Sequence, residues 1–457
     1  MDKKIVIVGA GVAGINAATK LVDTGYPGHL ITIIDKGNDP INRLPEEVMT
    51  GMLGAGGWSD GKLTYHTAIG GVLSKYCGEE KAMELMDQVI SNFRRFHPKP
   101  EEIFMSDPQE EPDFIKPYFG LRLFPVWHIG SNYLHEIAKT WYQYLVDRGI
   151  KFMWNHEVTG IGFGSKNVAC THNGGDIGYH ITYDTLIFGV GKSGIDFAQT
   201  LAKEHHLPTE PKSVQIGVRF EAPQKYFQKL IDISYDFKLY QKFNNVSLRS
   251  FCTNNNAAYV AVEETYGDVS YNGHAKKGEE FRNDMTNFGI LMEIKGIEDP
   301  FEWSRDVVNS LQINGTGLYY SPERTRTPGL TSEGVTVSTT QVYDLKSFIQ
   351  ATKGYGLFIT QFIDQMNQVF QFGTDWGIYI PEVKYLSPEP LVNYTNLALV
   401  DYPDTHFVGD ALSARGITVS GAQGIYVAEA LLNWNSNETV VNDENNNTMT
   451  SVDSLSL

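Results

Sequence analysis

Cysteine is scarce in this 457-residue sequence, and the three that occur, Cys77, Cys170 and Cys252, lie far apart. An odd number of cysteines without a C-x-x-C pair argues against a disulfide framework and against a cysteine metal or redox pair. The histidines also lack metal-ligand spacing, so we expect no metal site. A redox-active disulfide mechanism is disfavoured, and this cysteine usage is typical of a reducing, cytoplasmic location.

Basic residues are in deficit. The sequence has 37 Lys and Arg against 54 Asp and Glu, a formal net charge of −17. A surface potential of that sign repels phosphate backbones and anionic lipid headgroups, so we do not expect nucleic acid as a partner. Four of the negative charges fall in the last stretch of the chain, which has no Lys or Arg, so the folded part is less acidic than the total suggests.

Long apolar runs are missing as well. No eighteen consecutive residues are apolar, so no membrane-spanning helix is expected. With 42% hydrophobic and 20% charged residues the composition is that of a globular chain, and the length allows two to four domains around a large core. Residues 436–457 are rich in asparagine and without apolar periodicity, which predicts a disordered tail.

Residues 4–35 have the pattern of a strand, a glycine turn, a helix and a second strand. Residues 5–8 and 30–34 are continuously apolar, and residues 15–22 have helical spacing. Because the two strands are apolar throughout and do not alternate, both faces should be covered by other layers, as in a parallel sheet.

The turn of this unit carries the motif Gly9-x-Gly11-x-x-Gly14, and Asp35 follows the second strand. Gly9 permits the tight turn, Gly11 lets backbone N–H groups reach a pyrophosphate, Gly14 lets helix and strand pack closely, and Asp35 accepts hydrogen bonds from ribose hydroxyls. The alternative is a generic strand-turn-helix unit, but the strands and the acid stand where a dinucleotide site requires them. The predicted cofactor residues here are Gly9, Ala10, Gly11, Val12, Ala13, Gly14, Asp35 and Lys36.

A second cofactor segment is expected some 400 residues later. A short strand at 405–408 leads into Gly409-Asp410, and Arg415-Gly416 opens a helix over 417–432. An NAD site would be complete within one contiguous domain, whereas two distant segments suit the longer FAD. We expect Gly409 and Asp410 to hold the ribityl–phosphate side, and the helix N-terminus at Gly416 and Ile417 to face the flavin pyrimidine. The alternative for Gly-Asp alone is a simple turn.

Between these segments the chain has further regular elements. Apolar spacing predicts a helix over 79–96 and another that is capped by Ser131 and ends at Gly149. A strand-rich stretch follows from 151 to about 190, and residues 215–394 combine β-rich runs with helices near 303–311 and 357–370. We interpret the last region as a separate, substrate-facing domain.

Several segments together resemble a known family: IVIVGAGVAG, GAGGWSDGKL, HIGSNYL, IGVRFEAP, SFCTNN, ERTRTP and GDALSARGITVSGAQG. The family is that of microbial FAD-dependent dehydrogenases within the glutathione-reductase-like flavoproteins, related to geranylgeranyl reductases and aminoacetone oxidase-like proteins. The resemblance implies an α/β fold with a discontinuous, Rossmann-like FAD-binding domain and an inserted α+β substrate domain. The implied divisions are 1–75, 120–215 and 395–435 for the FAD-binding domain, 76–119 for a helical and loop insertion, 216–394 for the substrate or cap domain, and 436–457 for the tail.

The resemblance also assigns residues. It implies that the loop from Gly54 to Lys62 wraps the flavin, that backbone groups of Val158 meet the adenine, and that Arg43 lies near the diphosphate. The loop and turn residues so implied are Gly57, Ser59, Asp60, Gly61, Lys62, Gly189, Val190 and Gly191. One departure stands out: relatives resemble F-C-x-C-x-G-G where this chain reads FCTNNN from Phe251 to Asn256, which leaves the role of that loop open.

Three assignments have two interpretations. Gly189-x-Gly191-x-x-Gly194 could be a second nucleotide site for NAD(P)H, or a turn that ends a strand of the FAD domain itself. Lys62 and Arg326 could hold an anionic substrate or the reduced flavin, or could be solvated or salt-bridged side chains. Cys252 could be a nucleophile, but an isolated cysteine is more often buried and inert.

The predicted function is that of an FAD-dependent oxidoreductase which transfers hydride between a small organic substrate and flavin N5. The expected partners are a small-molecule substrate and NAD(P)H or another redox partner, with no nucleic acid and no membrane span. The alternatives are an FAD-dependent monooxygenase or desaturase and a non-catalytic FAD-binding protein.

Overall fold

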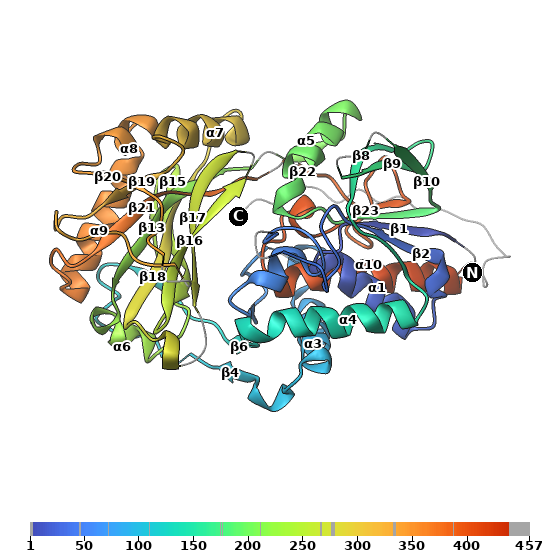
Figure 1. Cartoon of the computed structure of the whole chain (residues 1–457), viewed down its shortest axis with the longest axis horizontal. Helices are drawn as coiled ribbons and strands as arrows, with labels where there is room; N and C mark the ends of the chain where they lie inside the picture. The colour runs from blue at the N-terminus through green and yellow to red at the C-terminus, as the bar shows by residue number, and fades with distance from the viewer. Residues whose placement is uncertain are drawn as a thin grey trace, which may run out of the picture.

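Two hydrophobic cores organise the chain in the computed structural model. The parts of the chain built around them, here called the first and the second body, lie side by side in Figure 1. The structure describes residues 3–437 except 45, 46, 72, 109, 174, 176, 211, 266, 276–278, 332–334 and 387. The first core combines the N-terminal half of the chain with residues from 392 to 428, and the second is built mainly from residues 214–385. The predicted tail lies outside the described residues, apart from its first two positions, which continue the last helix.

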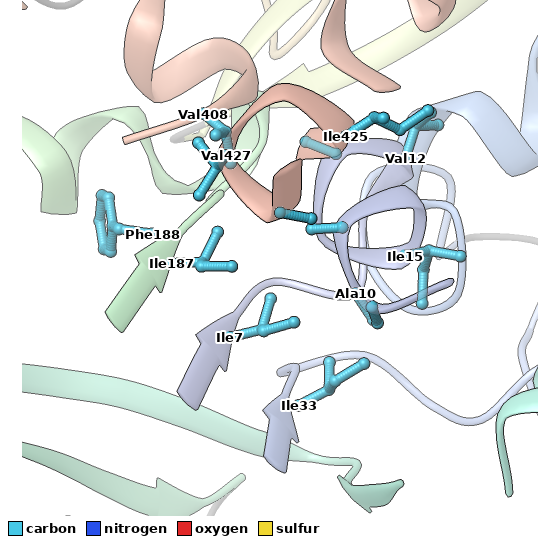
Figure 2. Close-up of a cluster of buried hydrophobic side chains, with 14 of the residues drawn as sticks. Ile7, Ala10, Val12, Ile15, Ile33, Ile187, Phe188, Val408, Ile425 and Val427 are labelled. Carbon is cyan, nitrogen blue, oxygen red and sulfur yellow. The ribbon is translucent and has the colours of Figure 1, made fainter. Parts of the chain in front are cut away.

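The first core surrounds a five-stranded parallel sheet with the order β23-β11-β1-β2-β7. Its strands are β1 (Ile5–Val8), β2 (Ile31–Ile34), β7 (Lys151–Met153), β11 (Thr185–Phe188) and β23 (Thr405–Phe407). All four residues of β1 are buried, as its unbroken apolar run predicts. Figure 2 shows side chains of this sheet, such as Ile7 and Ile187, in the same cluster as Ile425 of the C-terminal helix.

Four long helices pack around this sheet and one another (Figure 1). They are α1 (Val12–Asp23), α3 (Glu79–Phe96), α4 (Leu134–Asp147) and α10 (Ile417–Asn437). The predicted helix over 79–96 is confirmed by α3, which belongs to the first core and so is no separate insertion. The prediction that Ser131 caps α4 is wrong, because a 3-10 turn (Ser131–Tyr133) precedes the helix and the Ser131 hydroxyl donates to the carbonyl of Ala275.

Smaller elements extend the first body. A three-stranded antiparallel sheet comprises β8 (His156–Gly162), β9 (Asn167–His172) and β10 (Gly178–Thr182), and another comprises β3 (Lys62–Thr64), β4 (Phe104–Ser106) and β6 (Val126–His128). The remaining elements are α2 (Ser74–Cys77), α5 (Ile195–Glu204), β12 (Thr209–Glu210) and β22 (Glu389–Pro390), the last two paired with each other.

The second body contains an eight-stranded sheet with the order β20-β19-β21-β13-β18-β15-β14-β5, antiparallel except for the pair β19 and β20. Its strands are β5 (Gly120–Arg122), β13 (Val214–Pro223), β14 (Lys238–Phe243), β15 (Val246–Asn254), β18 (Met285–Ile294), β19 (Leu318–Tyr320), β20 (Thr340–Val342) and β21 (Gly377–Lys384). The hairpin of β16 (Ala258–Thr265) and β17 (Asp268–Ala275) packs against it, as do α7 (Pro300–Leu311) and α9 (Gly356–Phe370). The short helices α6 (Gln228–Ile231) and α8 (Lys346–Ala351) add Leu230 and Phe348 to the second core.

The two faces of the eight-stranded sheet differ in polarity. Alternate residues such as Ile216, Val218 and Phe220 of β13 are buried in one core with Ile359 and Phe362 of α9. Residues of the opposite parity point away from these helices. This second face is the one that meets the first body.

The division of the chain near residue 120 differs from the expected one. The sequence predicts that residues 120–215 belong to the cofactor domain. In the structure β5 pairs with β14 of the second body, and Ile115 and Phe119, just before β5, lie in the second core. An edge strand of three residues has too little periodicity to show which sheet it joins. The chain enters the second body for β5 and returns to the first body at β6.

Candidate functional site

A cavity of about 1490 Å³ lies between the two bodies. The first body lines it with the turns that follow β1, β2, β11 and β23, so the carboxyl ends of the parallel strands meet there. The second body lines it with the polar face of the eight-stranded sheet and with the hairpin of β16 and β17. Ligands of open α/β sheets bind at this edge of the sheet, which makes the cavity the candidate site.

The turn after β1 has no room for side chains. Gly9 has φ +100°, and a Cβ there would stand 2.5 Å from the carbonyl oxygen of Gly189. A Cβ on Gly14 would stand 2.3 Å from the carbonyl oxygen of Gly9. The glycines therefore allow the turn after β1, the turn after β11 and the first turn of α1 to come into contact. This is the geometry that the motif predicts.

The helix that follows is open at its N-terminus. Gly11 is the N-cap of α1, no side chain caps it, and the first turn has no acidic residue. Gly11, Val12 and Ala13 line the cavity. The positive end of the helix dipole thus faces the cavity, where a pyrophosphate could accept hydrogen bonds from the N–H groups of the first turn.

Asp35 also lines the cavity, and its carboxylate already holds the surrounding backbone. It accepts hydrogen bonds from the N–H groups of Ala10, Gly37 and Gly51, each at 2.8 Å. A carboxylate has about four acceptor positions, so at least one remains for a ribose hydroxyl. Asp35 therefore holds the turn after β1 and the loop that contains Gly37 and Gly51, and it can also bind a ligand.

The turn after β11 faces the same cavity as the turn after β1. Gly189 donates its N–H to the carbonyl of Val8 at 2.8 Å, and Gly189, Val190 and Gly191 all line the cavity. The two glycine motifs therefore stand at one ligand site and not at two separate ones. This geometry favours the interpretation that Gly189 to Gly194 ends a strand of the cofactor domain itself.

The C-terminal segment reaches the cavity through Gly409, Asp410, Gly416 and Ile417. Burial raises the pKa of Asp410, although Arg415, whose Nε lies 3.2 Å away, opposes the increase. The expected contact of the helix N-terminus with the flavin pyrimidine cannot use the Gly416 N–H, because this N–H donates to the carbonyl of Gly70 at 3.1 Å. In the first turn of α10, the hydroxyl of Thr418 is buried and has no hydrogen-bond partner among the described residues. This hydroxyl is therefore available to a ligand.

Five of the predicted cofactor residues do not line the cavity: Ala10, Gly14, Arg43, Gly57 and Gly61. Arg43 is the clearest correction, because its guanidinium donates to the carbonyls of Met52, Gly54, Glu47 and Val48. It therefore stabilises the loop around the cavity from behind and does not face a diphosphate. The other predicted cofactor residues line the cavity, among them Lys36, Ser59, Asp60 and Val158.

Lys62 bridges the two bodies inside the cavity. Its Nζ lies 2.7 Å from Asp60 and donates to the carbonyl of Thr253 at 2.7 Å, and it lies 3.8 Å from Asp236. Burial by itself lowers the pKa of Lys62, but Asp60 and Asp236 outweigh that effect, so the pKa lies well above its usual value. Lys62 is thus a fixed cation and part of the interface.

Arg326, the other predicted cation for an anionic substrate, does not line the cavity. Its Nη1 lies 2.5 Å from Asp375, and its Nη2 lies 3.9 Å from Glu221. This ion-paired position corrects the substrate hypothesis for Arg326.

Cys252 lines the cavity in a left-handed backbone conformation, with φ +52°. Burial raises the pKa of its thiol, which disfavours a nucleophilic role. Its carbonyl accepts a hydrogen bond from Arg219, which is fully buried and ion-paired to Glu382 at 2.6 Å. The loop that departs from the family pattern is therefore fixed by buried polar contacts.

Sequence reasoning missed the polar residues that the eight-stranded sheet presents to the cavity, such as Gln215, Arg249 and Lys384. The alternation of polar and apolar residues in β13, which reads VQIGVRFEAP, was the available signal. It indicates a strand with one polar face but does not indicate what lies opposite that face.

A comparison with known families finds a match in the N-terminal part of the chain. Residues 3–209 match the family model described as pyridine nucleotide-disulphide oxidoreductase. The match confirms the predicted Rossmann-like domain and the predicted oxidoreductase class, and it supports FAD as the cofactor. No curated protein matches the sequence.

Three solved structures are similar to the whole chain at low identity. A flavoprotein/dehydrogenase from Cytophaga hutchinsonii has 12% identity, with 94% of this chain and 79% of that chain covered and a TM-score of 0.40. CtdE in complex with FAD has 11% identity, coverage of 94% and 84%, and a TM-score of 0.37. The glycerol-3-phosphate dehydrogenase from Bacillus halodurans complexed with FAD has 11% identity, coverage of 97% and 66%, and a TM-score of 0.40. Likeness at this level does not define a substrate.

Among the described residues, no helix is long and apolar enough to cross a membrane.

Proposed function

We propose that this chain is an FAD-dependent oxidoreductase whose small organic substrate binds between the cofactor and the polar sheet face. The observation that carries the proposal is that three distant segments line one cavity: the turn with Gly9 and Gly11, the turn from Gly189 to Gly191, and the segment that includes Gly409, Asp410, Gly416 and Ile417. Segments from both ends of the chain suit a cofactor longer than one contiguous nucleotide domain can hold. The cavity volume of about 1490 Å³ exceeds the usual range for one small ligand, which supports a cofactor and a substrate together.

The residues divide by task in this proposal. Asp35 and Val158 would meet the adenosine end, the open N-terminus of α1 would meet the pyrophosphate, and the segment from Gly409 to Ile417 would lie along the flavin end. When bound, FAD supplies the electron chemistry by accepting or donating a hydride at N5. The chain itself would hold the cofactor on the first body and orient the substrate on the polar sheet face of the second.

Cofactor release tests the proposal directly. Protein purified after expression with excess riboflavin is denatured, and the released nucleotide is identified by chromatography. We expect FAD, bound without a covalent link. Recovery of NAD or FMN, or of no nucleotide, contradicts the proposal.

Oxygen reactivity distinguishes the dehydrogenase type from the monooxygenase alternative. We expect the photoreduced, FAD-loaded protein to be reoxidised by oxygen without an accumulating flavin–oxygen adduct in rapid-mixing absorbance spectra. Accumulation of such an adduct would favour the monooxygenase, and failure to photoreduce would favour a non-catalytic binding protein.

A further inference from the structure

The cavity face of the eight-stranded sheet carries polar residues in register. Lys384 of β21 stands opposite Gln215 of β13, Gln215 stands opposite Glu293 of β18, and Glu293 stands opposite Ser247 of β15. Directly paired residues point to the same face, and so does Arg249, two positions after Ser247. All five of these residues line the cavity.

Contacts bring two cations of this wall close to a third from the first body. The Nη2 of Arg249 donates to the Oε1 of Gln215 at 3.0 Å, beside Lys384. The Nζ of Lys384 lies 3.9 Å from the ring centroid of Phe251. From the first body, Arg415 donates to the carbonyl of Tyr385, the residue that follows Lys384. We call Arg249, Lys384 and Arg415 the cationic cluster.

Two more cations extend the wall. Lys238 of β14 has its Nζ 4.7 Å from the ring centroid of Phe124, and Arg122 of β5 is its paired neighbour. Both line the same cavity. Polarity on this wall is therefore a property of six strands and not of one side chain.

The carboxylates near this wall act on its cations as well as on other partners: Glu293 opposes the lowering of the Arg249 pKa by burial, and Asp236 opposes that of the Lys238 pKa. Glu293 accepts a hydrogen bond from Ser213 at 2.8 Å, and Asp236 lies 3.8 Å from the Nζ of Lys62. Asp410 lies 3.2 Å from Arg415 and is ion-paired with this member of the cationic cluster. Burial, followed by Arg249, Arg415 and Lys238, lowers the pKa of Lys384 well below its usual value, as expected where cations outnumber their counter-charges.

We propose that the cationic cluster binds an anionic group of the substrate, a carboxylate or a phosphate. The four cations on this wall, with Arg415 from the first body, contrast with a chain of net charge −17, so the cavity would concentrate an anion that the rest of the surface repels. A guanidinium fork suits an oxyanion, and Gln215 fixes the fork of Arg249. A bound anion would also favour the protonated form of Lys384 against the cations around it.

The geometry separates this site from the pyrophosphate position. The open N-terminus of α1 lies on the first body, whereas Arg249 and Lys384 come from the sheet of the second body. Assignment of the bound anion to a substrate rests on the proposed oxidoreductase function. The anion would then fix one end of the substrate, and the rest of the molecule would extend toward the flavin.

The test measures anion binding by titration calorimetry on the protein as purified, with inorganic phosphate and succinate as separate probes. We expect at least one probe to bind, and we expect Arg249→Gln and Lys384→Gln each to weaken its affinity about ten- to hundredfold. Phosphate binding alone identifies a phosphorylated substrate class, and succinate binding alone a carboxylate class. The matched control is Lys346→Gln on α8, which removes one charge from a side chain that is 81% exposed, and it should leave affinity unchanged.

Three results would overturn the proposal: no binding of either probe, equal weakening by Lys346→Gln, or loss of FAD instead of anion affinity in the two cluster variants. If the variants do not fold, binding by the unaltered protein must still weaken as sodium chloride rises from about 20 to about 300 mM. A protein that lacks FAD but binds phosphate through Arg249 contradicts the proposed function alone. A protein that holds FAD but binds neither anion contradicts the anion site alone.

Discussion

Asp35 illustrates how one residue can be both structural and functional. Its carboxylate accepts three backbone hydrogen bonds and still faces the cavity. The sequence predicted the ribose contact from the position of Asp35 after a strand. It did not predict the contacts with Gly37 and Gly51, because those glycines approach only when the loops are folded.

We therefore predict two effects for Asp35→Ala. FAD affinity should fall about ten- to hundredfold, because the ribose loses a charged acceptor. The free energy of unfolding should also fall by about 1–3 kcal/mol or more, because backbone N–H groups lose their acceptor. Flavin retention on dilution and chemical denaturation measure the two effects.

Asp39→Ala is the matched control for Asp35→Ala. Asp39 also accepts backbone hydrogen bonds, from Ile41 at 2.9 Å and Asn42 at 3.1 Å, but it does not line the cavity. Its removal should leave FAD affinity unchanged. Equal flavin retention in both variants would contradict the role of Asp35 at the ribose.

His406 predicts a pH dependence of stability. It is 1% exposed in β23, and burial lowers its pKa to about 4, although its contact with the Asn396 carbonyl and the charge of Asp404 oppose this. In the unfolded chain the pKa is about 6.5, so between pH 6.5 and about 4 the unfolded state binds the additional proton. Stability is therefore complete above pH 6.5 and decreases as the pH falls toward 4.

The expected contribution of His406 is about 2 kcal/mol of unfolding free energy between pH 7 and pH 5. His406→Gln should reduce the difference between these two pH values by that amount, as measured by urea denaturation. The control is His180→Gln, whose side chain is exposed on β10. If His406→Gln leaves the difference unchanged, another group accounts for the pH dependence.

At the scale of elements, strands and helices with long apolar patterns were predictable from sequence. The strand at 5–8, the helix at 79–96 and the helix at the C-terminus all form as expected, because each buries a face that its own residues define. Short elements such as β5 were not predictable, because three residues do not specify a partner strand. The cavity wall was missed for a related reason: the pattern of β13 shows a polar face but not its neighbour.

The two glycines of the turn after β11 should behave differently when they are replaced. A Cβ on Gly191 would meet no atom within 4 Å, whereas a Cβ on Gly194 would stand 2.7 Å from the Cβ of Val190. We predict that Gly191→Val folds with an unchanged unfolding midpoint but retains less FAD, because its side chain enters the cavity. Gly194→Val should lower both the unfolding midpoint and the flavin content.

Flavin absorbance and thermal unfolding measure these outcomes. If Gly191→Val keeps its full flavin spectrum and selectively loses NADPH oxidation, the turn belongs to a second nucleotide site. That result would reverse the interpretation that both glycine turns serve one cofactor.

At the scale of the whole molecule, ion pairs join the two bodies across the cavity. Lys62 of the first body reaches Thr253 and Asp236 of the second, and Lys192 of the first lies 2.5 Å from Glu263 of β16. Burial by itself raises the pKa of Glu263, but Lys192 and Asn272 lower it to about 2. The pair therefore contributes stability at neutral pH that is lost as the pH falls from about 4.5 toward 2.

We predict that Lys192→Met destabilises the protein by about 3–5 kcal/mol, because Glu263 would remain buried without its cation. The double variant Lys192→Met, Glu263→Gln should recover most of this loss, since no uncompensated charge remains. Urea denaturation followed by circular dichroism measures both.

If the pair couples the two bodies, the single variant should also broaden the transition or split it in two, with the cofactor released in the first step. A single variant as stable as the unaltered protein, or a double variant that recovers nothing, would show that the bodies are held together by their other contacts.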